Sequence, residues 1–226
     1  MHLGQRVGQS EVESCQVLIF DFDGTITNLD TGELVLTRLS DGDWRYHHEQ
    51  YLRGEFSFEE CLRRQYSHLK FATKASILSL VDEEVRVRAY FAELVDAAQL
   101  AEVPVVVASY GLDFCIEHVL DGVRNGSDIR IYSPRTTLGS GGTRLGFPRR
   151  RVKGSINLKD DVVAWYKQKG FKVIFAGDGA SDFPAASSAD RSFAIEGSEL
   201  AKMCEIKGVK CTSITDFRPV ANTLFG

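Results

Sequence analysis

Cysteines are few and lack the spacing that a disulfide framework or a zinc site needs. The 226 residues contain five cysteines, an odd number, and no two of them form a CxxC pair. Most lie in or beside apolar runs, so we expect buried free thiols in a reducing compartment. We therefore expect neither disulfides nor a cysteine-based zinc site.

Long apolar runs and a strong excess of one charge are also absent. No apolar run approaches the roughly 20 residues of a membrane helix, and the polar first 14 residues lack the apolar segment of a signal peptide. The formal charge of −4 argues against a general nucleic-acid or membrane-surface role. We expect a cytoplasmic globular protein, monomeric or homodimeric, with no nucleic-acid or membrane partner.

What the sequence does contain is a series of short apolar runs rich in valine and isoleucine. They occupy residues 15–20, 103–109, 128–133, 171–177 and 192–195. Such runs are typical of strands buried on both faces of a parallel sheet. Helical patterns separate them, at residues 112–120, 157–170 and 181–189. Strand alternating with helix predicts an α/β fold, a Rossmann-like doubly wound parallel sheet.

Residues 29–100 interrupt this alternation, because they contain no convincing strand. Their apolar spacing fits helices throughout, and the last of these would span 84–100. Candidate helix starts are Asp43, Ser57 and Thr73. We predict a small α-helical cap at 29–100, inserted into a core domain formed by 1–28 and 101–226, over the carboxyl edge of the sheet.

Two further features of the sequence are less specific. The segment 134–156 is basic and rich in glycine, but it lacks the GK[ST] ending of a phosphate-binding P-loop, so we expect a mobile hairpin or loop. The adjacent His47 and His48 point to different sides of a helix and make a poor metal pair with each other.

Polar side chains gather where the predicted strands end. The set comprises Asp21, Asp23, Ser109, Lys159, Asp178 and Asp182. The carboxyl ends of parallel strands share one edge, so these groups are expected to converge there. Converging carboxylates repel one another, and Mg²⁺ would offset the repulsion, while the lysine and the hydroxyl could hold phosphoryl oxygens. Each motif alone fits an ordinary turn or helix cap, but the ordered set predicts a phosphoryl-transfer site.

These residues resemble the haloacid dehalogenase (HAD) superfamily of phosphohydrolases. The superfamily signature hhhDxDGT matches residues 21–25, its strand-end serine or threonine matches Ser109, and its last acidic motif matches GDGASD at 177–182. Its lysine has two candidates, Lys153 and Lys159. Lys159 is preferred, because its distance from the last motif leaves room for one helix, a turn and a strand.

The resemblance implies a role for each of these positions. Asp21 would be the nucleophile and Asp23 the general acid/base. A Mg²⁺ cofactor would be bound by Asp21, by Asp178 and by the backbone carbonyl of Asp23. Asp182 would support the metal site from outside the ligand shell. The residues implied to bind the phosphoryl group are Ser109, Tyr110, Gly111 and Lys159.

The helical cap resembles the phosphoserine-phosphatase-like branch, and parts of the chain are similar to methionine-salvage phosphatases, which act on a methylthio-substituted enediol-type sugar derivative. The similar stretches are DFDGTIT, YLRGEFSFEECLRRQYSHL and SYGLDFCIEHVLDG. The cysteine-rich stretch of that group is replaced by FPRRRVKGSIN, and Gln65 stands where phosphoserine phosphatases carry an arginine. The substrate therefore stays open, and candidate specificity residues are Asp30, Arg53 and Arg64.

The sequence thus predicts a Mg²⁺-dependent phosphomonoesterase that hydrolyses a small phosphorylated metabolite through an aspartyl phosphate on Asp21. Asp23 favours hydrolysis, because dehalogenases of the superfamily lack this aspartate and its transport ATPases carry threonine there. Alternatives within the superfamily are a phosphoserine phosphatase and a phosphomutase. The alternative of another class is a non-catalytic binding protein on the same fold.

Overall fold

Six parallel strands form the central sheet, in the order β3-β2-β1-β6-β7-β8. The computed structural model describes residues 15–124 and 126–224. The strands are β1 (Gln16–Phe20), β2 (Val105–Ala108), β3 (Ile129–Tyr132), β6 (Lys172–Gly177), β7 (Arg191–Ile195) and β8 (Thr212–Ile214). The chain builds the sheet outward from β1 in both directions, so the crevice of a doubly wound sheet lies beside β1.

The central strand explains why the apolar runs are continuous. Side chains of a strand alternate between its two faces. Val17 and Ile19 are buried in the apolar cluster on one face of the sheet, and Leu18 and Phe20 in the cluster on the other. Both faces are covered, so every position of β1 after its first residue is buried.

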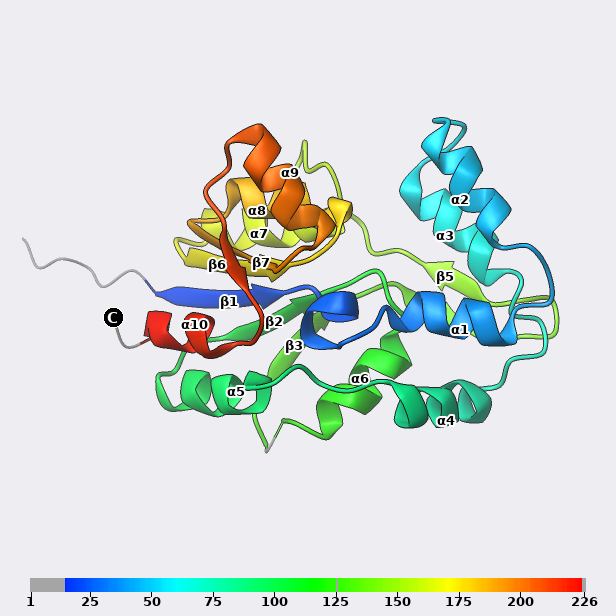
Figure 1. The fold of residues 1–226 in the computed structure, drawn as a ribbon, viewed down its shortest axis with the longest axis horizontal. Coiled ribbons are helices and arrows are strands. Elements are labelled where there is room, and N and C mark those ends of the chain that lie inside the picture. The colour runs from blue at the N-terminus through cyan, green and yellow to red at the C-terminus, as the bar shows by residue number, and fades with distance from the viewer. Residues whose placement is uncertain (1–14, 125, 225–226) are drawn as a thin grey trace, which may run out of the picture.

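Helices cover both faces of the sheet, as Figure 1 shows. On one side lie α7 (Leu158–Gln168), α8 (Phe183–Ser188) and α9 (Glu199–Lys207). On the other lie α5 (Phe91–Leu100), α6 (Asp113–Asp121) and α10 (Arg218–Ala221). Short single turns are η1 (Phe22–Ile26), η2 (Ala180–Asp182) and η3 (Asn222–Leu224). The predicted α/β class, a doubly wound parallel sheet, is confirmed.

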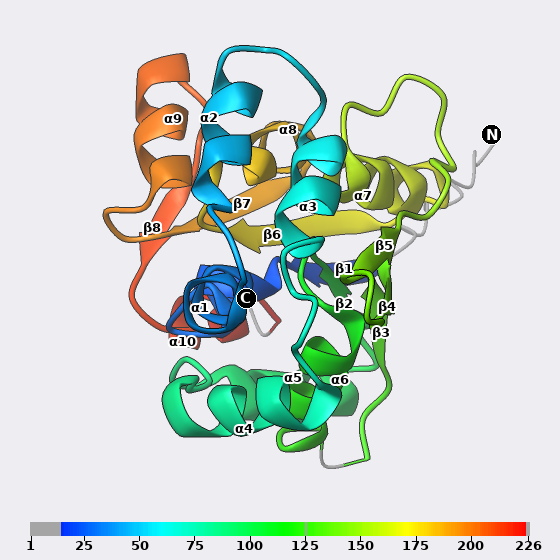
Figure 2. The same ribbon diagram turned by 90° about the vertical axis from the view of Figure 1, so that its right-hand side faces the viewer.

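Four helices lie beyond the carboxyl edge of the sheet, where Figure 2 looks onto them. They are α1 (Thr31–Leu39), α2 (Arg45–Leu52), α3 (Phe58–Tyr66) and α4 (Lys74–Glu84). Residues of α1, α3 and α4, together with Trp44 just before α2, form a third apolar cluster, the cap cluster, which also includes Cys115 of α6. Ser57 and Thr73 cap α3 and α4 as expected. The predicted start at Asp43 is wrong, because Trp44, buried in the cap cluster, precedes α2 and no side chain caps that helix.

The chain returns from the cap in an extended conformation, so the first half of the predicted helix 84–100 is wrong. Val87 forms an antiparallel bridge with Thr27, and the backbone N–H of Arg88 donates to the carbonyl of Ile26 at 2.7 Å. Tyr90 has a φ of 65°, and α5 begins only after it. Tertiary pairing with the outgoing segment therefore overrides the local helical pattern.

The position of α5 bears on the predicted division into a core and a cap at 29–100. Phe91 and Leu94 of α5 pack in the same cluster as Leu18 and Phe20 of β1. The division itself stays a prediction, and this packing leads us to propose that the cap ends with α4.

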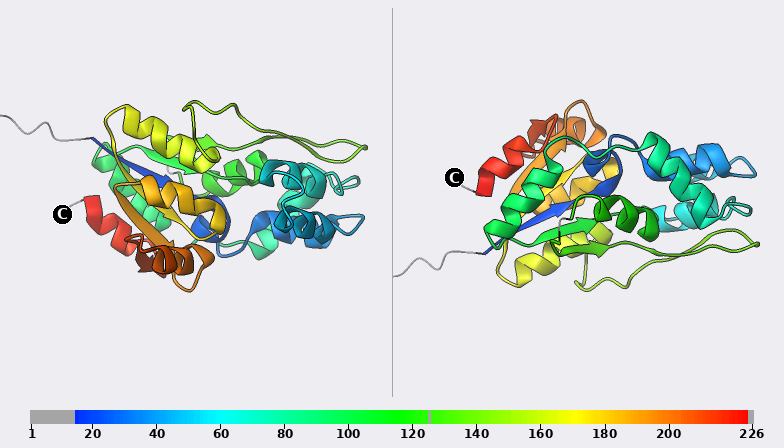
Figure 3. Two further views of the ribbon diagram at one scale, coloured as in Figure 1. Left: turned by 90° about the horizontal axis from the view of Figure 1, so that it is seen from above. Right: turned by 90° about the horizontal axis from the view of Figure 1, so that it is seen from below.

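A β-hairpin lies within the basic, glycine-rich segment, consistent with the hairpin alternative. Its strands are β4 (Arg135–Thr137) and β5 (Arg144–Gly146). Figure 3 shows this segment extending along one side of the molecule to the cap. There the N–H of Thr143 donates to the carbonyl of Tyr66 at 3.3 Å, and Leu145 joins the cap cluster. The hairpin thus fastens the end of α3 to the core.

Other expectations from composition have mixed outcomes. All five cysteines lie within the described residues and are free, but Cys15 is exposed. Among residues 15–124 and 126–224, no helix is both long and apolar enough to cross a membrane. The expectation that no signal peptide is present concerns residues 1–14, which lie outside the described residues.

Candidate active site

The carboxyl ends of β1, β2 and β6 meet at a small cavity of about 140 Å³ between the sheet and the cap. Asp21 follows β1 directly, and its backbone N–H continues the ladder by donating to the carbonyl of Ala176 at 2.9 Å. Its side chain is only 7% exposed. Thus the rigid central strand fixes this carboxylate at the floor of the cavity.

Lys159, on the first turn of α7, is the cation of the site. Its Nζ lies 2.9 Å from Oδ1 of Asp21 and 2.7 Å from Oδ1 of Asp182. Burial lowers the pKa of Lys159, but Asp182 and Asp21 outweigh burial, and the net shift is upward. The other candidate, Lys153, is exposed and does not line the cavity. The geometry therefore agrees with the choice of Lys159.

Three carboxylates form one cluster, with one oxygen each from Asp21, Asp178 and Asp182 within 4.8 Å of one another. Burial, followed by the charge of Asp182, raises the pKa of Asp21 well above its usual range. The same two causes, in the same order, raise the pKa of Asp178 to about 6. Gly24 is required beside them, because a Cβ there would lie 2.3 Å from Oδ2 of Asp178.

The donors of this cluster fit a hard divalent cation. Carboxylate oxygens are what Mg²⁺ prefers. The raised pKa values of Asp21 and Asp178 arise first from burial and then from repulsion by Asp182, and Lys159 does not cancel them. Asp182 is already engaged, because its Oδ2 accepts from the N–H groups of Asp178 and Gly179 at 3.0 and 2.9 Å. This agrees with its expected supporting role.

Asp23 turns its carboxylate away from that cluster and toward the cap. Its Oδ1 accepts from the backbone N–H of Thr31 at 2.9 Å and also from the Thr31 hydroxyl. Burial, followed by the charge of Asp30, raises the pKa of Asp23 to about 7, although the Thr31 hydrogen bonds lower it. A carboxyl group with such a pKa is partly protonated near neutral pH, as a general acid requires.

The segment after β2 completes the floor of the cavity. The buried Ser109 hydroxyl accepts a hydrogen bond from the N–H of Gly111 at 2.9 Å. It also donates to Oδ2 of Asp23 at 3.4 Å. Gly111 is required, because a Cβ there would lie 2.5 Å from the same oxygen. The Tyr110 hydroxyl accepts from the N–H of Leu158 at 3.0 Å, so Tyr110 also positions the helix that carries Lys159.

A larger cavity of about 430 Å³ lies next to it in the cap. Four residues line both cavities: Asp30, Phe58, Leu62 and Tyr66. We call the larger one the cap pocket; its further lining residues are Gly32, Glu33, Leu36, Trp44, Arg45, His48, Glu49 and Gln65. The two cavities are therefore adjacent at these four residues.

The sequence model of the haloacid dehalogenase-like hydrolases matches residues 18–187, which contain all of the strand-end residues described above. The chain belongs to this family. Its named relatives are phosphatases, which confirms the predicted enzyme class, a HAD-type phosphatase.

Two similar relatives are 2-hydroxy-3-keto-5-methylthiopentenyl-1-phosphate phosphatases. The one from Bacillus pumilus (strain SAFR-032) is 26% identical over 182 residues, which cover 79% of this chain and 78% of the relative. The one from Geobacillus kaustophilus (strain HTA426) is 26% identical over 220 residues, which cover 92% and 94%. A solved phosphoserine phosphatase, in a phospho-aspartyl intermediate analogue, superposes with a TM-score of 0.70 over 93% of this chain and 99% of its own, at 18% identity. That last likeness concerns the fold.

Within this HAD enzyme, the predicted specificity residues separate into two groups. Asp30 lines both cavities, although it also caps α1. Arg53 and Arg64 line neither cavity. Each instead reaches along its own helix to a glutamate four residues away, at 3.6 and 2.9 Å, and stays partly exposed. The structure therefore does not bring these two arginines to the site.

Several residues of the site escaped the sequence reasoning. Thr31 holds Asp23, and the guanidinium of Arg88 donates to the carbonyls of Gly24 at 2.7 Å and Thr25 at 2.8 Å. The lining residues on α3 carried a usable signal, because positions 58, 62, 65 and 66 lie on one face of a helix. For Arg88 there was no such signal, because its partners lie more than sixty residues earlier.

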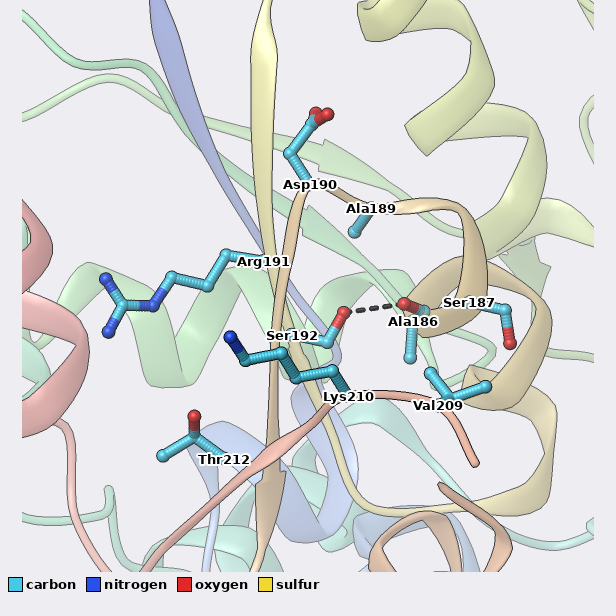
Figure 4. A pocket seen from close by; sticks show the side chains of 9 residues that line it. All are labelled: Ala186, Ser187, Ala189, Asp190, Arg191, Ser192, Val209, Lys210 and Thr212. Carbon is cyan, nitrogen blue, oxygen red and sulfur yellow. Dashed lines mark hydrogen bonds between the residues drawn. The ribbon is translucent and has the colours of Figure 1, made fainter. Parts of the chain in front are cut away.

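A still larger cavity, of about 580 Å³, lies at the opposite, amino-terminal ends of β7 and β8 (Figure 4). Arg191, Lys210 and Asp190 are among its lining residues. Asp190 already accepts from the N–H of Val173 at 2.9 Å and from Lys167 at 3.2 Å. This cavity contains none of the strand-end carboxylates, so size alone does not identify the catalytic site.

Proposed function

We propose that the protein is a Mg²⁺-dependent phosphomonoesterase that hydrolyses a small phosphorylated metabolite through an aspartyl phosphate on Asp21. One observation carries the proposal: a buried strand-end carboxylate lies 2.9 Å from a buried lysine, in a cluster with Asp178 and Asp182. A nucleophile, a cation for the phosphoryl group and a cation-binding acidic cluster thus occupy one small cavity.

In the first step, Asp21 attacks phosphorus while the bond to the leaving oxygen breaks. Asp23 gives its proton to that oxygen, so the alcohol leaves neutral and Asp23 becomes a carboxylate. Lys159 and the Ser109 hydroxyl bind the equatorial phosphoryl oxygens, where negative charge is spread in the transition state. Bound Mg²⁺, held by the side chains of Asp21 and Asp178 and by the backbone carbonyl of Asp23, would supply charge neutralisation for the acidic cluster and the phosphate.

In the second step, water attacks the phosphorus of the aspartyl phosphate. Asp23 now accepts a proton from that water, the bond to Asp21 breaks, and inorganic phosphate is released. Both carboxyl groups return to their starting protonation states. One phosphomonoester and one water have become one alcohol and one phosphate.

The cap pocket suggests what the leaving group is. Its walls are apolar at Leu36, Phe58 and Leu62, and the buried Gln65, a residue only 5% exposed, adds an amide to its lining. The carboxylates Asp30, Glu33 and Glu49 also line it, and they would repel a substrate carboxylate. Further, Arg45 is turned onto the Trp44 ring at 4.3 Å and toward Glu33 at 3.7 Å.

We therefore propose a phosphate ester of an uncharged, oxygen-bearing molecule with an apolar end. The 2-hydroxy-3-keto-5-methylthiopentenyl-1-phosphate named for the relatives has this character, and phosphoserine does not. A phosphometabolite panel with both compounds tests this. Higher kcat/KM for phosphoserine would contradict it, and Gln65→Leu should raise KM for the preferred substrate with less effect on kcat.

The chemistry itself is tested with p-nitrophenyl phosphate, whose leaving group makes few demands on the cap pocket. Asp21→Asn, or chelation of Mg²⁺, should lower kcat more than about a thousand-fold, because the nucleophile or the charge neutralisation is lost. Lys159→Ala should cost about a hundred-fold. The matched control is Lys153→Ala, which removes an exposed lysine outside the cavity. Substantial turnover by folded Asp21→Asn would overturn the mechanism.

A cytoplasmic location belongs to the proposal as well. All five cysteines are free thiols, which persist in a reducing compartment. The expected partner is the small phosphomonoester, and whether the enzyme acts as a monomer or a homodimer stays a prediction that sedimentation would test.

A further inference from the structure

Two histidines meet in the cap, and neither lines the cavity that contains the acidic cluster. His47 lies on α2, and His68 lies just after α3. Their Nε2 atoms are 3.1 Å apart and their ring centroids 5.3 Å apart, so the two rings point these nitrogens at each other. His48, the sequence neighbour of His47, instead lines the cap pocket. The sequence alone suggests only His48 as a partner for His47, whereas the fold places His68 beside His47.

The outer nitrogen of each ring faces an oxygen. Nδ1 of His47 lies 3.2 Å from Oε1 of Gln50, and the Gln50 amide is oriented by its own donation to Glu55 at 2.8 Å. Nδ1 of His68 lies 3.6 Å from Oδ1 of Asp41. Because these contacts favour the hydrogen of each neutral ring on Nδ1, both Nε2 atoms are left as acceptors.

Two acceptor nitrogens that face each other repel unless a cation lies between them. A tetrahedral Zn²⁺ with ligands at about 2.0–2.1 Å holds two imidazole nitrogens about 3.3–3.4 Å apart, close to the distance observed here. Metal-binding histidines also commonly turn their other nitrogen to a carboxylate or carbonyl oxygen, as both rings do here. We propose that His47 and His68 bind a divalent transition-metal ion, of the class that Zn²⁺ represents.

The donor set separates this site from the proposed Mg²⁺ site. Imidazole suits zinc, copper and nickel, whereas carboxylates suit magnesium. The His68 side chain is 24% exposed, so solvent can reach the ion and water can complete its coordination. The ion would join α2 to the chain that follows α3, and both helices line the cap pocket. Its effect would be to fix one wall of that pocket.

Zinc binding to the chelator-treated full-length protein tests the proposal. With Mg²⁺ in excess to occupy the acidic cluster, competition against a chromophoric zinc chelator should reveal one Zn²⁺ per chain. His47→Gln and His68→Gln should each weaken that binding at least about ten-fold, and Asp41→Asn should weaken it without abolishing it. His48→Gln is the matched control and should bind Zn²⁺ as the wild type does. Zinc should also raise the Tm of the wild type in a concentration-dependent way.

A shared proton between the rings is the competing explanation. The proposal would be overturned if the wild type bound no more Zn²⁺ than the His47→Gln/His68→Gln double variant. Loss of Zn²⁺ binding by His48→Gln to the same degree as by the other two variants would also overturn it. If a variant fails to fold, ring NMR signals of the wild type decide the matter. Zinc should shift those of His47 and His68 and leave those of His48 in place.

Discussion

Asp23 is held between a charge that raises its pKa and a neighbour that lowers it. Burial and then Asp30 raise the pKa to about 7, while the two hydrogen bonds from Thr31 favour the carboxylate. Both neighbours belong to the start of α1, so the cap sets the acidity of a group in the core. The proposed general acid is therefore tuned by the first turn of the cap.

This arrangement predicts opposite effects of two small changes. Asp30→Asn keeps a good helix cap but removes the charge, so the pKa of Asp23 should fall. Thr31→Val removes one hydrogen bond to the carboxylate, so the same pKa should rise. Because the general acid must be protonated, kcat should begin to fall at a lower pH in Asp30→Asn and at a higher pH in Thr31→Val than in the wild type.

Full pH profiles with a poor leaving group, where protonation matters most, measure both shifts. Movement of the two limbs in the same direction would refute the assignment of Asp23 as the acid. With p-nitrophenyl phosphate the shifts should be smaller, because that leaving group needs little help from an acid.

The residues that could be predicted from the sequence are those carried by strand ends. Asp21, Ser109 and Asp178 follow apolar runs, and the edge of a parallel sheet brings such positions together whatever the loops do. Thr31 and Gln65 depend on how the cap packs on the core, which no local pattern records. Arg53 and Arg64 line neither cavity, and in a sequence charge alone does not separate a helix-surface ion pair from a ligand.

The strap at residues 85–90 shows how an element can carry function without regular structure. Arg88 lies in it, and its guanidinium reaches the carbonyls of Gly24 and Thr25, with a longer contact of 3.4 Å to that of Thr27. These carbonyls belong to the turn that follows Asp23. One side chain on the return from the cap thus fastens the loop that carries the acid.

Replacing Arg88 by alanine should lower kcat by about 10- to 100-fold, because the loop holding Asp23 loses its fastening. KM should change less, since Arg88 lines neither cavity. The matched control is Arg86→Ala, because Arg86 contacts the carbonyls at the end of α4 instead. Partial recovery with added guanidinium would identify the missing group.

An Arg88→Ala variant with unchanged kcat, or an equal loss in Arg86→Ala, would rule out this positioning role.

The strap at residues 85–90 also shows where helical periodicity in the sequence gives a wrong prediction. Residues 85–90 fit a helix in isolation, and only the pairing of Val87 with Thr27, sixty residues earlier in the chain, explains why they leave the helical conformation.

Across the whole molecule, the sheet and the existence of a helical insertion followed from the sequence. Continuous apolar runs predict strands covered on both faces, and helical spacing without strands predicts the insertion. The contacts between cap, hairpin and core did not follow. They join segments such as Thr143 with Tyr66, whose pairing depends on three-dimensional packing alone.

The acidic cluster links the stability of the whole protein to Mg²⁺ and pH. The pKa of Asp178, about 6, and the raised pKa of Asp21 both lie above those of an unfolded chain, so the folded protein binds more protons. Stability without metal should therefore fall as pH rises from about 4 through the folded pKa values. Mg²⁺ binds the deprotonated cluster, so it should restore stability mainly above that range.

Calorimetric Tm values with Mg²⁺ and with a chelator, at pH 5 and pH 8, measure this coupling. The increase in Tm caused by Mg²⁺ should be several degrees larger at pH 8 than at pH 5, because the cluster is deprotonated at pH 8. Groups that titrate elsewhere affect the Tm with Mg²⁺ and the Tm with chelator alike, so they do not contribute to this increase. Asp178→Asn removes one proposed ligand and should remove most of the increase. Equal increases at both pH values would mean that Mg²⁺ does not bind these buried carboxylates, and the proposed metal site would fail with them.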